Sequence, residues 1–307
     1  MKARTAFLAK GDLVYILCTA RSATSKELRP AVDLLESWGL RVELGTTIDL
    51  VHHQQGGTTA QRAADFTTAL HDPDVKAIWI ARGGYGTVHI MEQVDLSGLG
   101  GDSAFAKAQH APKLLIGYSD ATLLHAIFNN TGFPSLHSFM PLELKHKTQV
   151  SIDSLRNALF EREITLTIPN DQELPEMNLV GKVYGGNLSI LYSLLGSADF
   201  PDLDGGILFI EEIDEYLYHV ERMMYSLKRA GALQGLKAIV VGGMTDLRDH
   251  EIPHGLNYQQ IIENATTGYD YPIIYNFPAG HIENHHSIIL GAQMQIKITP
   301  QKIVISQ

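Results

Sequence analysis

The sequence contains almost no cysteine. Its single cysteine, Cys18, lies in the apolar run LVYILCTA, so we expect a buried core residue and exclude a disulfide framework. That usage fits a reducing compartment. Residues 1–18 hold no apolar run long enough for a signal peptide, and no stretch reaches the roughly 18 apolar residues that span a bilayer. We therefore expect a cytoplasmic protein that does not enter a membrane.

Basic residues are also in short supply. Lysine and arginine number 24 against 34 aspartates and glutamates, which gives a formal net charge of -10. Nucleic acids and anionic membranes bind clustered lysine and arginine, so we expect neither as the main partner. With 307 residues and 45% hydrophobic content, the chain can bury a sizeable core in two domains without disulfides or metals.

Short apolar runs alternate with amphipathic stretches in the first half of the chain. Because apolar strands separated by helices are typical of a parallel sheet with both faces covered, the pattern predicts an α/β fold. Functional groups in such sheets collect at the carboxyl ends of the strands, where the loops RGGYG and GYSD are expected. The strands are expected at residues 13–20, 41–45, 77–82, 114–118 and 134–139, and the helices at residues 25–39, 58–72, after Gly86 and from Ser119.

The composition changes between residues 141 and 178. This segment is polar and contains Pro141, Pro169 and Pro175, so we interpret it as a connection between domains with some local structure. Apolar strands and helices then alternate again, which predicts a second α/β unit. The alternating runs MQIKI and KIVIS flank a Pro-Gln turn near the end and predict a hairpin.

Ser119, in the stretch GYSDA, has two interpretations. A serine before a helix can cap it by accepting a backbone N–H, which is worth about 1 kcal/mol, but Thr122 stands where a capping box has Glu or Gln. The stretch also resembles the nucleophile elbow G-x-S-x-G, with Ala121 in the last place. In that case the N–H of Asp120 would face a developing oxyanion. The motif alone leaves the two interpretations evenly balanced.

The segment RGGYGTVH contains three glycines at the end of an expected strand. Gly83, Gly84 and Gly86 let a backbone N–H approach a ligand, but their spacing differs from the dinucleotide-binding G-x-G-x-x-G. The segment could supply a second oxyanion donor, with Arg82 available for a substrate carboxylate. Taken alone, it is more typical of a tight turn between strand and helix.

The stretch from His250 to His254 has the form H-E-x-x-H. A zinc site of that type needs both histidines on one face of a continuous helix. Pro253 lies between them, and the flanking residues are typical of a loop. We therefore expect no metal site there.

Two further groups of residues follow expected strands. Glu211 and Glu212 end the run GILFIEE and are either a solvated strand end or an active-site acid, and strand periodicity cannot choose between them. His281 follows the strand IIYNF where a catalytic base could lie, although a lone histidine is more often a hydrogen-bonded loop residue. Its spacing to His285 and His286 matches no common metal-ligand set.

Together these pieces resemble one family. Ser119 in GYSDAT, Glu211 in FIEE and His281 in FPAGH resemble the Ser…Glu…His triad of the LD-carboxypeptidases, which include murein tetrapeptide carboxypeptidases and microcin C immunity peptidases. The blocks GDLVYILCTA, RGGYGT, GYSDATLLH and GGNLSIL match in the same order, so the resemblance covers nearly the whole chain.

The resemblance implies a flavodoxin-like parallel-sheet N-terminal domain and a smaller α/β C-terminal domain. We expect the first to span residues 1–165 and carry the serine, and the second to span residues 166–307 and carry the acid and the base. The active site would lie in the cleft between them. After Gly-His the sequence continues with Ile282-Glu283, which is bulkier and more polar than the glycine-rich family pattern.

The resemblance also implies a reaction. Ser119 would attack the L,D bond to the terminal D-alanine of a murein tetrapeptide, His281 would take and return the proton, and Glu211 would orient the imidazole. The expected partner is thus a small peptide or muropeptide, processed by a homodimer without metal or organic cofactor.

Five further residues receive expected roles on the same basis. The backbone N–H groups of Asp120 and Gly84 are expected to hold the oxyanion. Arg82, Gly83 and Asn187 are expected to bind substrate, with Arg82 on the free terminal carboxylate.

Three other functions stay open from sequence. Within the family, the substrate could be an aminoacyl-nucleotide antibiotic of the microcin C type. A generic α/β-hydrolase esterase shares the Ser…Glu…His order, but Ala121 replaces the last glycine of its elbow and no H-G-G-G motif occurs. A two-domain ligand-binding protein is the third possibility, and the missing signal peptide argues against a periplasmic one.

Overall fold

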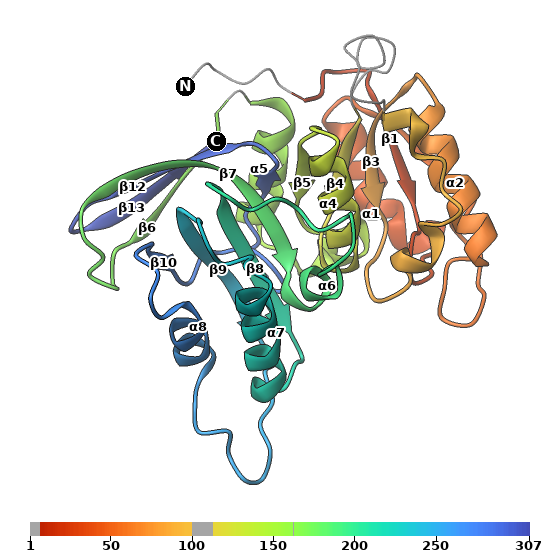
Figure 1. The fold of residues 1–307 in the computed structure, drawn as a ribbon. Helices are drawn as coiled ribbons and strands as arrows, with labels where there is room; N and C mark the ends of the chain where they lie inside the picture. Colours follow the sequence, from red (N-terminus) through yellow and green to blue (C-terminus); the bar gives the residue numbers. More distant parts are fainter. Residues whose placement is uncertain (1–6, 100–112, 162) are drawn as a thin grey trace.

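The computed structural model describes residues 7–99, 113–161 and 163–307, and its strands form two sheets (Figure 1). The first has six strands in the order β11-β5-β4-β3-β1-β2. Strands β1 to β5 are parallel, and their order 2-1-3-4-5 is that of flavodoxin-like folds, which confirms the predicted parallel sheet. The strands are β1 (Leu13–Leu17), β2 (Arg41–Leu44), β3 (Val75–Ile80), β4 (Leu114–Gly117), β5 (Ser135–His137) and β11 (Ile288–Leu290).

Helices cover both faces of the first sheet, because each presents an apolar side to it. Two of them begin with capping boxes, formed by Thr24 with Glu27 and by Thr58 with Gln61. The helices are α1 (Ser25–Ser37), α2 (Thr59–His71), α4 (Thr122–Asn130) and α5 (Gln149–Phe160), with short 3-10 helices at Thr87–Ile90, Leu96–Leu99, Ser119–Ala121 and Pro141–His146.

The second sheet has seven strands in the order β10-β9-β8-β7-β12-β13-β6. Strands β7 to β10 are parallel, and β12 and β13 form the predicted antiparallel hairpin. The strands are β6 (Thr165–Pro169), β7 (Met177–Asn187), β8 (Ile207–Ile213), β9 (Ala238–Thr245), β10 (Ile273–Ile274), β12 (Gln293–Ile298) and β13 (Lys302–Ser306), and the helices are α6 (Leu188–Ser193), α7 (Leu217–Arg229) and α8 (Tyr258–Thr266).

The segment expected as a connection has more structure than its composition indicated. It holds α5, whose Leu155 and Leu159 are fully buried in the core of the first sheet, and β6, an edge strand of the second. The chain also returns late to the first sheet, where β11 pairs antiparallel with β5 through Ile289 and Leu136. The domain boundary between residues 165 and 166 stays a prediction.

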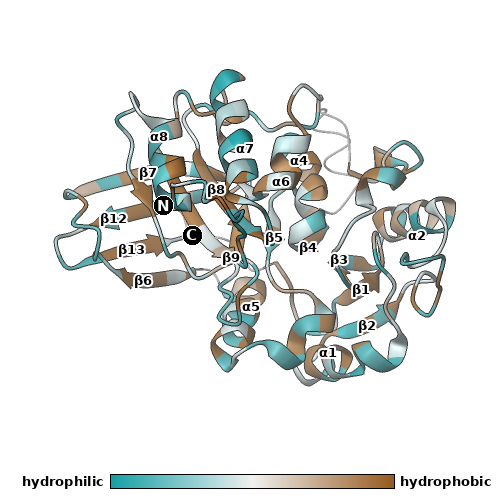
Figure 2. Cartoon of the chain, turned by 90° about the horizontal axis from the view of Figure 1, so that it is seen from below, coloured by the Kyte–Doolittle hydropathy of each residue, from teal (hydrophilic) through white to brown (hydrophobic). Residues whose placement is uncertain are grey.

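Apolar side chains fill the space between each sheet and its helices. Figure 2 shows hydrophobic residues on the strands of both sheets. Trp79, Phe66 and Phe128 are fully buried, and so is Cys18, as predicted. The buried Trp79 indole N–H donates to the carbonyl of Phe139 at 3.0 Å, so its polar atom is satisfied. The sheets are therefore rigid supports for the loops at their carboxyl ends.

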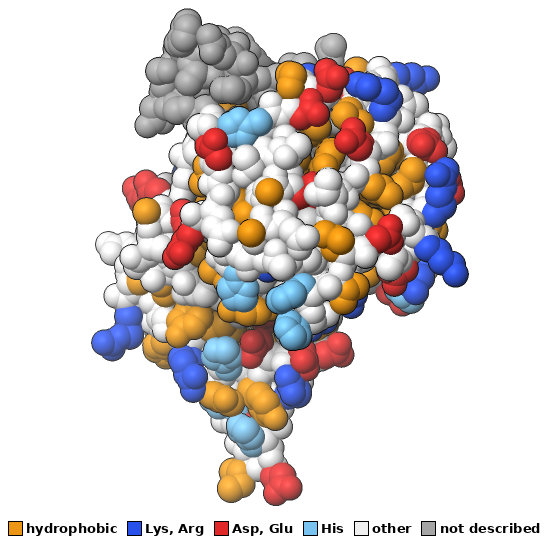
Figure 3. Space-filling model, turned by 90° about the vertical axis from the view of Figure 1, so that its right-hand side faces the viewer, with side chains coloured by type: hydrophobic (Ala, Val, Ile, Leu, Met, Phe, Trp, Pro, Cys, Tyr) orange, Lys and Arg blue, Asp and Glu red, His pale blue; other side chains and the backbone are white. Residues whose placement is uncertain are grey.

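Charged side chains of both signs are interspersed on the face drawn in Figure 3, and histidines gather near its middle and lower part. Within the described ranges, no helix is both long enough and apolar enough to cross a bilayer.

Candidate active site

Ser119 lies two residues after the end of β4, in a sharp turn between strand and helix, and Tyr118 precedes it. Its φ of 62° lies in the left-handed region, which L-residues other than glycine, asparagine and aspartate rarely adopt. A Cβ on Gly117 would lie 3.3 Å from atoms of Ala121 and Ile80, so the turn has little room for a side chain there. The geometry is that of a nucleophile elbow, in which strain at the serine exposes its hydroxyl.

Ser119 does not cap the following helix. The N-cap residue of α4 is Ala121, and neither it nor the preceding 3-10 turn has a side-chain capping hydrogen bond. The Ser119 hydroxyl Oγ lies instead 3.2 Å from Nε2 of His281. The capping interpretation is therefore wrong.

His281 connects Ser119 to a carboxylate. Its Nδ1 lies 2.7 Å from Oε2 of Glu211, a residue near the end of β8. The two sheets thus bring Ser119, His281 and Glu211 into one hydrogen-bonded chain, although 162 residues separate the serine from the histidine. The predicted serine, base and acid lie together.

The pairing of β8 with β9 is irregular at the two adjacent glutamates, and only Glu211 contacts the histidine. Ile210 pairs with Val241 and Glu212 with Met244, so Glu211 lies opposite two residues of β9, Gly242 and Gly243, and the extra residue of the bulge is in β9. Glu212 accepts hydrogen bonds from the side chain of Asn187 at 2.9 Å and from the N–H of Ser189 at 2.7 Å. The two carboxylates therefore serve different partners.

The ionisable side chains of His281 and Glu211 are mostly buried. The Glu211 side chain has no exposed surface, and that of His281 is 15% exposed. Burial lowers the pKa of His281, but the nearby carboxylates, Glu211 first and then Glu143 and Glu212, together outweigh burial and raise that pKa. An imidazolium is thus stabilised where a general base would form it.

Two glycines permit this close packing. A Cβ on Gly280, whose φ is 110°, would lie 2.8 Å from both Cβ and Oε2 of Glu211. A Cβ on Gly83 would lie 3.2 Å from Cβ of Ser119 and 3.3 Å from its Oγ. Gly280 therefore lets the histidine loop approach the acid, and Gly83 lets the RGGYG turn approach the serine.

The two expected oxyanion donors lie on adjoining turns. The Asp120 carboxylate accepts the N–H of Thr87 at 2.8 Å, which ties the turn after β4 to the RGGYG segment. Gly84 has a φ of 107°, and a Cβ there would collide with the side chain of Arg21 at 2.6 Å. The roles of Asp120 and Gly84 as oxyanion donors stay predictions.

Arg82 and Asn187 are both engaged elsewhere. The guanidinium of Arg82 donates to the carbonyl of Ser22 at 3.2 Å. The Asn187 side chain caps α6 by accepting the N–H of Ile190, and its backbone N–H donates to Oγ1 of Thr122 at 3.0 Å. Asn187 therefore joins β7 to α4, and the substrate-binding roles of Arg82 and Asn187 stay predictions.

The sequence analysis did not identify His125, which stabilises the turn that holds Ser119. It is fully buried, and its ring nitrogens lie 2.9 Å from the carbonyl of Gly117 and 2.8 Å from Oγ of Ser135. Burial lowers the pKa of His125 to about 4, so it stays neutral at pH 7. The block GYSDATLLH contains the signal, because its histidine lies in the first turn of α4, immediately after the turn that holds the serine.

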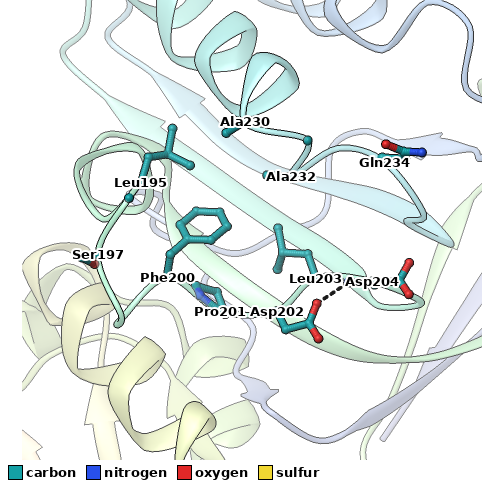
Figure 4. A pocket seen from close by; sticks show the side chains of 12 residues that line it. Leu195, Ser197, Phe200, Pro201, Asp202, Leu203, Asp204, Ala230, Ala232 and Gln234 are labelled. Carbon is teal, nitrogen blue, oxygen red and sulfur yellow. Dashed lines mark hydrogen bonds between the residues drawn. The ribbon is translucent and has the colours of Figure 1, made fainter.

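The other candidate sites lie apart from this cluster. Residues His250 to His254 form a loop rather than a helix, and the described part of the chain holds no group of three or more His, Cys, Asp or Glu arranged to bind a metal. A surface pocket of about 420 Å³ lies between the connection from α6 to β8 and the turn after α7 (Figure 4). Its acidic residues are Asp202 and Asp204, and it does not include the serine, histidine or acid above.

Models of one protein family match both halves of the chain. The model of the LD-carboxypeptidase N-terminal domain matches residues 14–138, and that of the LD-carboxypeptidase C-terminal domain matches residues 180–296.

Similar proteins cover nearly the whole chain. A probable murein peptide carboxypeptidase of Bacillus subtilis is 32% identical over 97% of this chain and 92% of its own length. A murein tetrapeptide carboxypeptidase of Pseudomonas aeruginosa is 28% identical over 87% of each chain. The microcin C7 self-immunity protein MccF of Escherichia coli is 25% identical over 98% of this chain and 94% of its own.

A solved structure shares the fold. The muramoyltetrapeptide carboxypeptidase of Oxalobacter formigenes superposes with a TM-score of 0.84 at 23% identity, over 96% of this chain and 98% of the other.

Proposed function

The chain belongs to the LD-carboxypeptidase family and is a serine-type carboxypeptidase, and we propose that it removes the terminal D-alanine of murein tetrapeptides with a triad of Ser119, His281 and Glu211. The observation that carries the proposal is the continuous chain of contacts from the serine hydroxyl to the buried carboxylate. Cytoplasmic location and a homodimer remain expectations from sequence.

The first half of the reaction forms an acyl-enzyme. Ser119 Oγ attacks the carbonyl carbon of the L,D bond while His281 Nε2 takes its proton. The imidazolium then gives that proton to the leaving amine of D-alanine, and the bond between carbonyl and amine breaks. In the second half water attacks the acyl-enzyme, and the same histidine serves again as base and acid.

Glu211 acts on the histidine rather than on the substrate. Its carboxylate accepts the N–H at Nδ1, which leaves Nε2 free to take the serine proton. Because this carboxylate is fully buried, its attraction for the imidazolium is weakly screened by water. The pair therefore stabilises the charge that develops on His281.

The adjoining turns supply the expected oxyanion donors. The N–H of Asp120 is at the start of the helix that follows the serine, and the N–H of Gly84 belongs to the turn that contacts it. Losing one such donor typically reduces the rate by about 10²–10³-fold. The mechanism uses no metal or organic cofactor, so EDTA should leave the rate unchanged.

The similarity to the microcin C7 self-immunity protein favours a second candidate, the hydrolysis of an aminoacyl-nucleotide by the same three residues. One assay separates the two. The purified protein is incubated with disaccharide-tetrapeptide and, separately, with a processed aminoacyl-nucleotide, and mass spectrometry identifies which one loses its terminal group. Loss of D-alanine supports the proposed function, and cleavage of the nucleotide alone contradicts it.

The serine is tested in the same assay. Ser119→Ala should abolish hydrolysis and leave the thermal midpoint near that of the wild type, because the hydroxyl caps no helix. Ser37→Ala, on the exposed side of α1, is the matched control and should retain full activity. Full activity in Ser119→Ala would exclude the serine mechanism.

A further inference from the structure

The residue before the nucleophile, Tyr118, packs directly against the histidine. Its side chain is 1% exposed, and its ring centroid lies 4.6 Å from that of His281. The ring centroids of two buried histidines, His285 and His137, lie 4.9 and 5.6 Å from that of Tyr118, in edge-on arrangements. The ring of His281 thus rests on a tyrosine that is covalently joined to Ser119.

The hydroxyl of Tyr118 is anchored. It donates to Oε1 of Glu143 at 2.5 Å, and Oε2 of Glu143 accepts the N–H of Met140 at 3.0 Å. Burial and the nearby carboxylate raise the pKa of Tyr118 well above its usual value, so the phenol stays protonated and remains a donor. Glu143 therefore fixes the far end of the ring.

A lysine beside Tyr118 also binds the loop that contains His281. Nζ of Lys147 donates to the carbonyl of Ile282 at 2.7 Å and lies 5.8 Å from the Tyr118 ring centroid. Glu143 and Lys147 lie on the segment that follows β5 of the first sheet, whereas Ile282 lies in the loop that leads from β10 of the second sheet back to β11 of the first. This contact therefore bridges the two halves of the site next to the base.

From these contacts we propose that Tyr118 positions His281 against Ser119, and that Glu143 and Lys147 hold the tyrosine ring and the histidine loop in that arrangement. The inference rests on the proposed role of His281 as the base. Its physical basis is proximity, because proton transfer requires the imidazole within hydrogen-bond reach of the serine hydroxyl. Nothing in the chemistry assigned to the three triad residues requires the tyrosine.

Kinetics of Tyr118 variants form the first test. Tyr118→Leu removes the ring and should lower kcat by about 100-fold, while Tyr118→Phe removes only the anchor and should lower it by about tenfold. KM should stay within about twofold in both, because the ring positions the base rather than the substrate. Tyr15→Phe is the matched control, since Tyr15 is also a buried tyrosine, bonded to Asp65 at 2.9 Å, and should retain wild-type kcat.

Titration of His281 by NMR forms the second test and needs no substrate. The charged or titratable groups around this ring are Glu211 and Glu212 on β8, Glu143 and Lys147 beside Tyr118, and the buried His137 and His285. The negative charge of Glu143 helps to raise the pKa of His281. Glu143→Gln should therefore lower that pKa and move the acid limb of the kcat/KM profile to lower pH.

The rate at which a fluorophosphonate labels Ser119 is the third readout, because it also depends on the base. The inference is overturned if Tyr118→Phe and Tyr118→Leu are labelled at the wild-type rate, or if Glu143→Gln leaves the titration of His281 unchanged. A wild-type protein that is labelled but does not cleave the tetrapeptide would contradict the proposed substrate alone. Should Tyr118→Leu not fold, Tyr118→Phe and Glu143→Gln still decide the question.

Discussion

The two sheets contribute to the candidate active site in physically different ways. The first supplies a residue in a strained backbone conformation, Ser119 at a φ of 62°. The second supplies a buried charge, Glu211, whose Oε1 has no hydrogen-bond partner among the described residues. Both features reduce the stability of the fold. The candidate active site is therefore destabilised by backbone strain at the residue from the first sheet and by desolvation at the residue from the second.

Replacing the strained serine should have the largest effect on activity. Ser119→Gly removes the proposed nucleophile and should lower kcat by about 10⁴-fold or more. Glycine adopts a positive φ without steric strain, so this variant should unfold with a free energy about 1 kcal/mol higher than Ser119→Ala, which keeps the strained conformation. Urea denaturation of the two variants measures the difference. Equal stabilities would show that the turn holds no strain.

Replacing the buried acid should have the next largest effect. Glu211→Gln no longer stabilises an imidazolium and should lower kcat by about 10³–10⁴-fold. Since it also removes a buried charge, the free energy of unfolding should stay level or rise by about 1 kcal/mol. Glu212→Gln, one residue away but bonded to Asn187 and Ser189, is the control and should lose less than tenfold. Equal losses in the two variants would contradict the division of roles between them.

The close approach of the histidine loop to the acid gives the third prediction. In Gly280→Ala the new Cβ meets Glu211 at 2.8 Å and the φ of 110° becomes strained, so we expect a loss of about 2–4 kcal/mol in unfolding free energy and about 10- to 100-fold in kcat. Gly255→Ala is the control: its φ is 88°, but no atom lies within 4 Å of the added Cβ. It should lose only about 1 kcal/mol and keep its activity. Similar losses in both variants would mean that strain alone, and not contact with Glu211, explains the effect.

Local sequence patterns predicted the strands and helices of the first sheet and the loops that follow its strands. The apolar runs of β1, β3 and β4 and the loops after them could be located because their signals lie within a few neighbouring residues. The three residues of the proposed triad could be named only through several matched blocks, since Ser119 alone fitted a helix cap equally well. The structure resolves that ambiguity through a contact from Oγ of Ser119 to His281, in the loop between β10 and β11.

The features that the sequence analysis did not predict depend on contacts between residues far apart in the sequence. The choice of Glu211 over Glu212 follows from the contact of Glu211 with His281, 70 residues away in the sequence, and periodicity within β8 contains no trace of that contact. The pairing of β11 with β5 joins segments about 150 residues apart, and a three-residue strand gives no signal of its own. In the sequence Tyr118 is an ordinary apolar position, and only the structure shows its contacts with Glu143 and His281.

The pH dependence of Glu212 gives the smallest expected effect and tests the desolvated side of the comparison. Burial raises the pKa of Glu212 to about 7, despite the N–H donors that favour its charged form. Between its ordinary pKa of 4.5 and about 7, the folded protein therefore holds a proton that the unfolded chain has lost. This contribution to stability is complete below the lower value and is lost as the pH rises through the upper one.

Comparison of variants isolates that contribution from the other titrating groups. Relative to Glu212→Gln, the wild type should lose on the order of 2–3 kcal/mol of unfolding free energy between pH 4.5 and pH 8, measured by urea denaturation at each pH. Glu36→Gln, on the exposed side of α1, should follow the wild-type slope. Parallel curves for wild type and Glu212→Gln would mean that the N–H donors of Ser189 and Ile213 and the amide of Asn187 hold the carboxylate ionised. In that case desolvation destabilises this side of the site less than backbone strain destabilises the other.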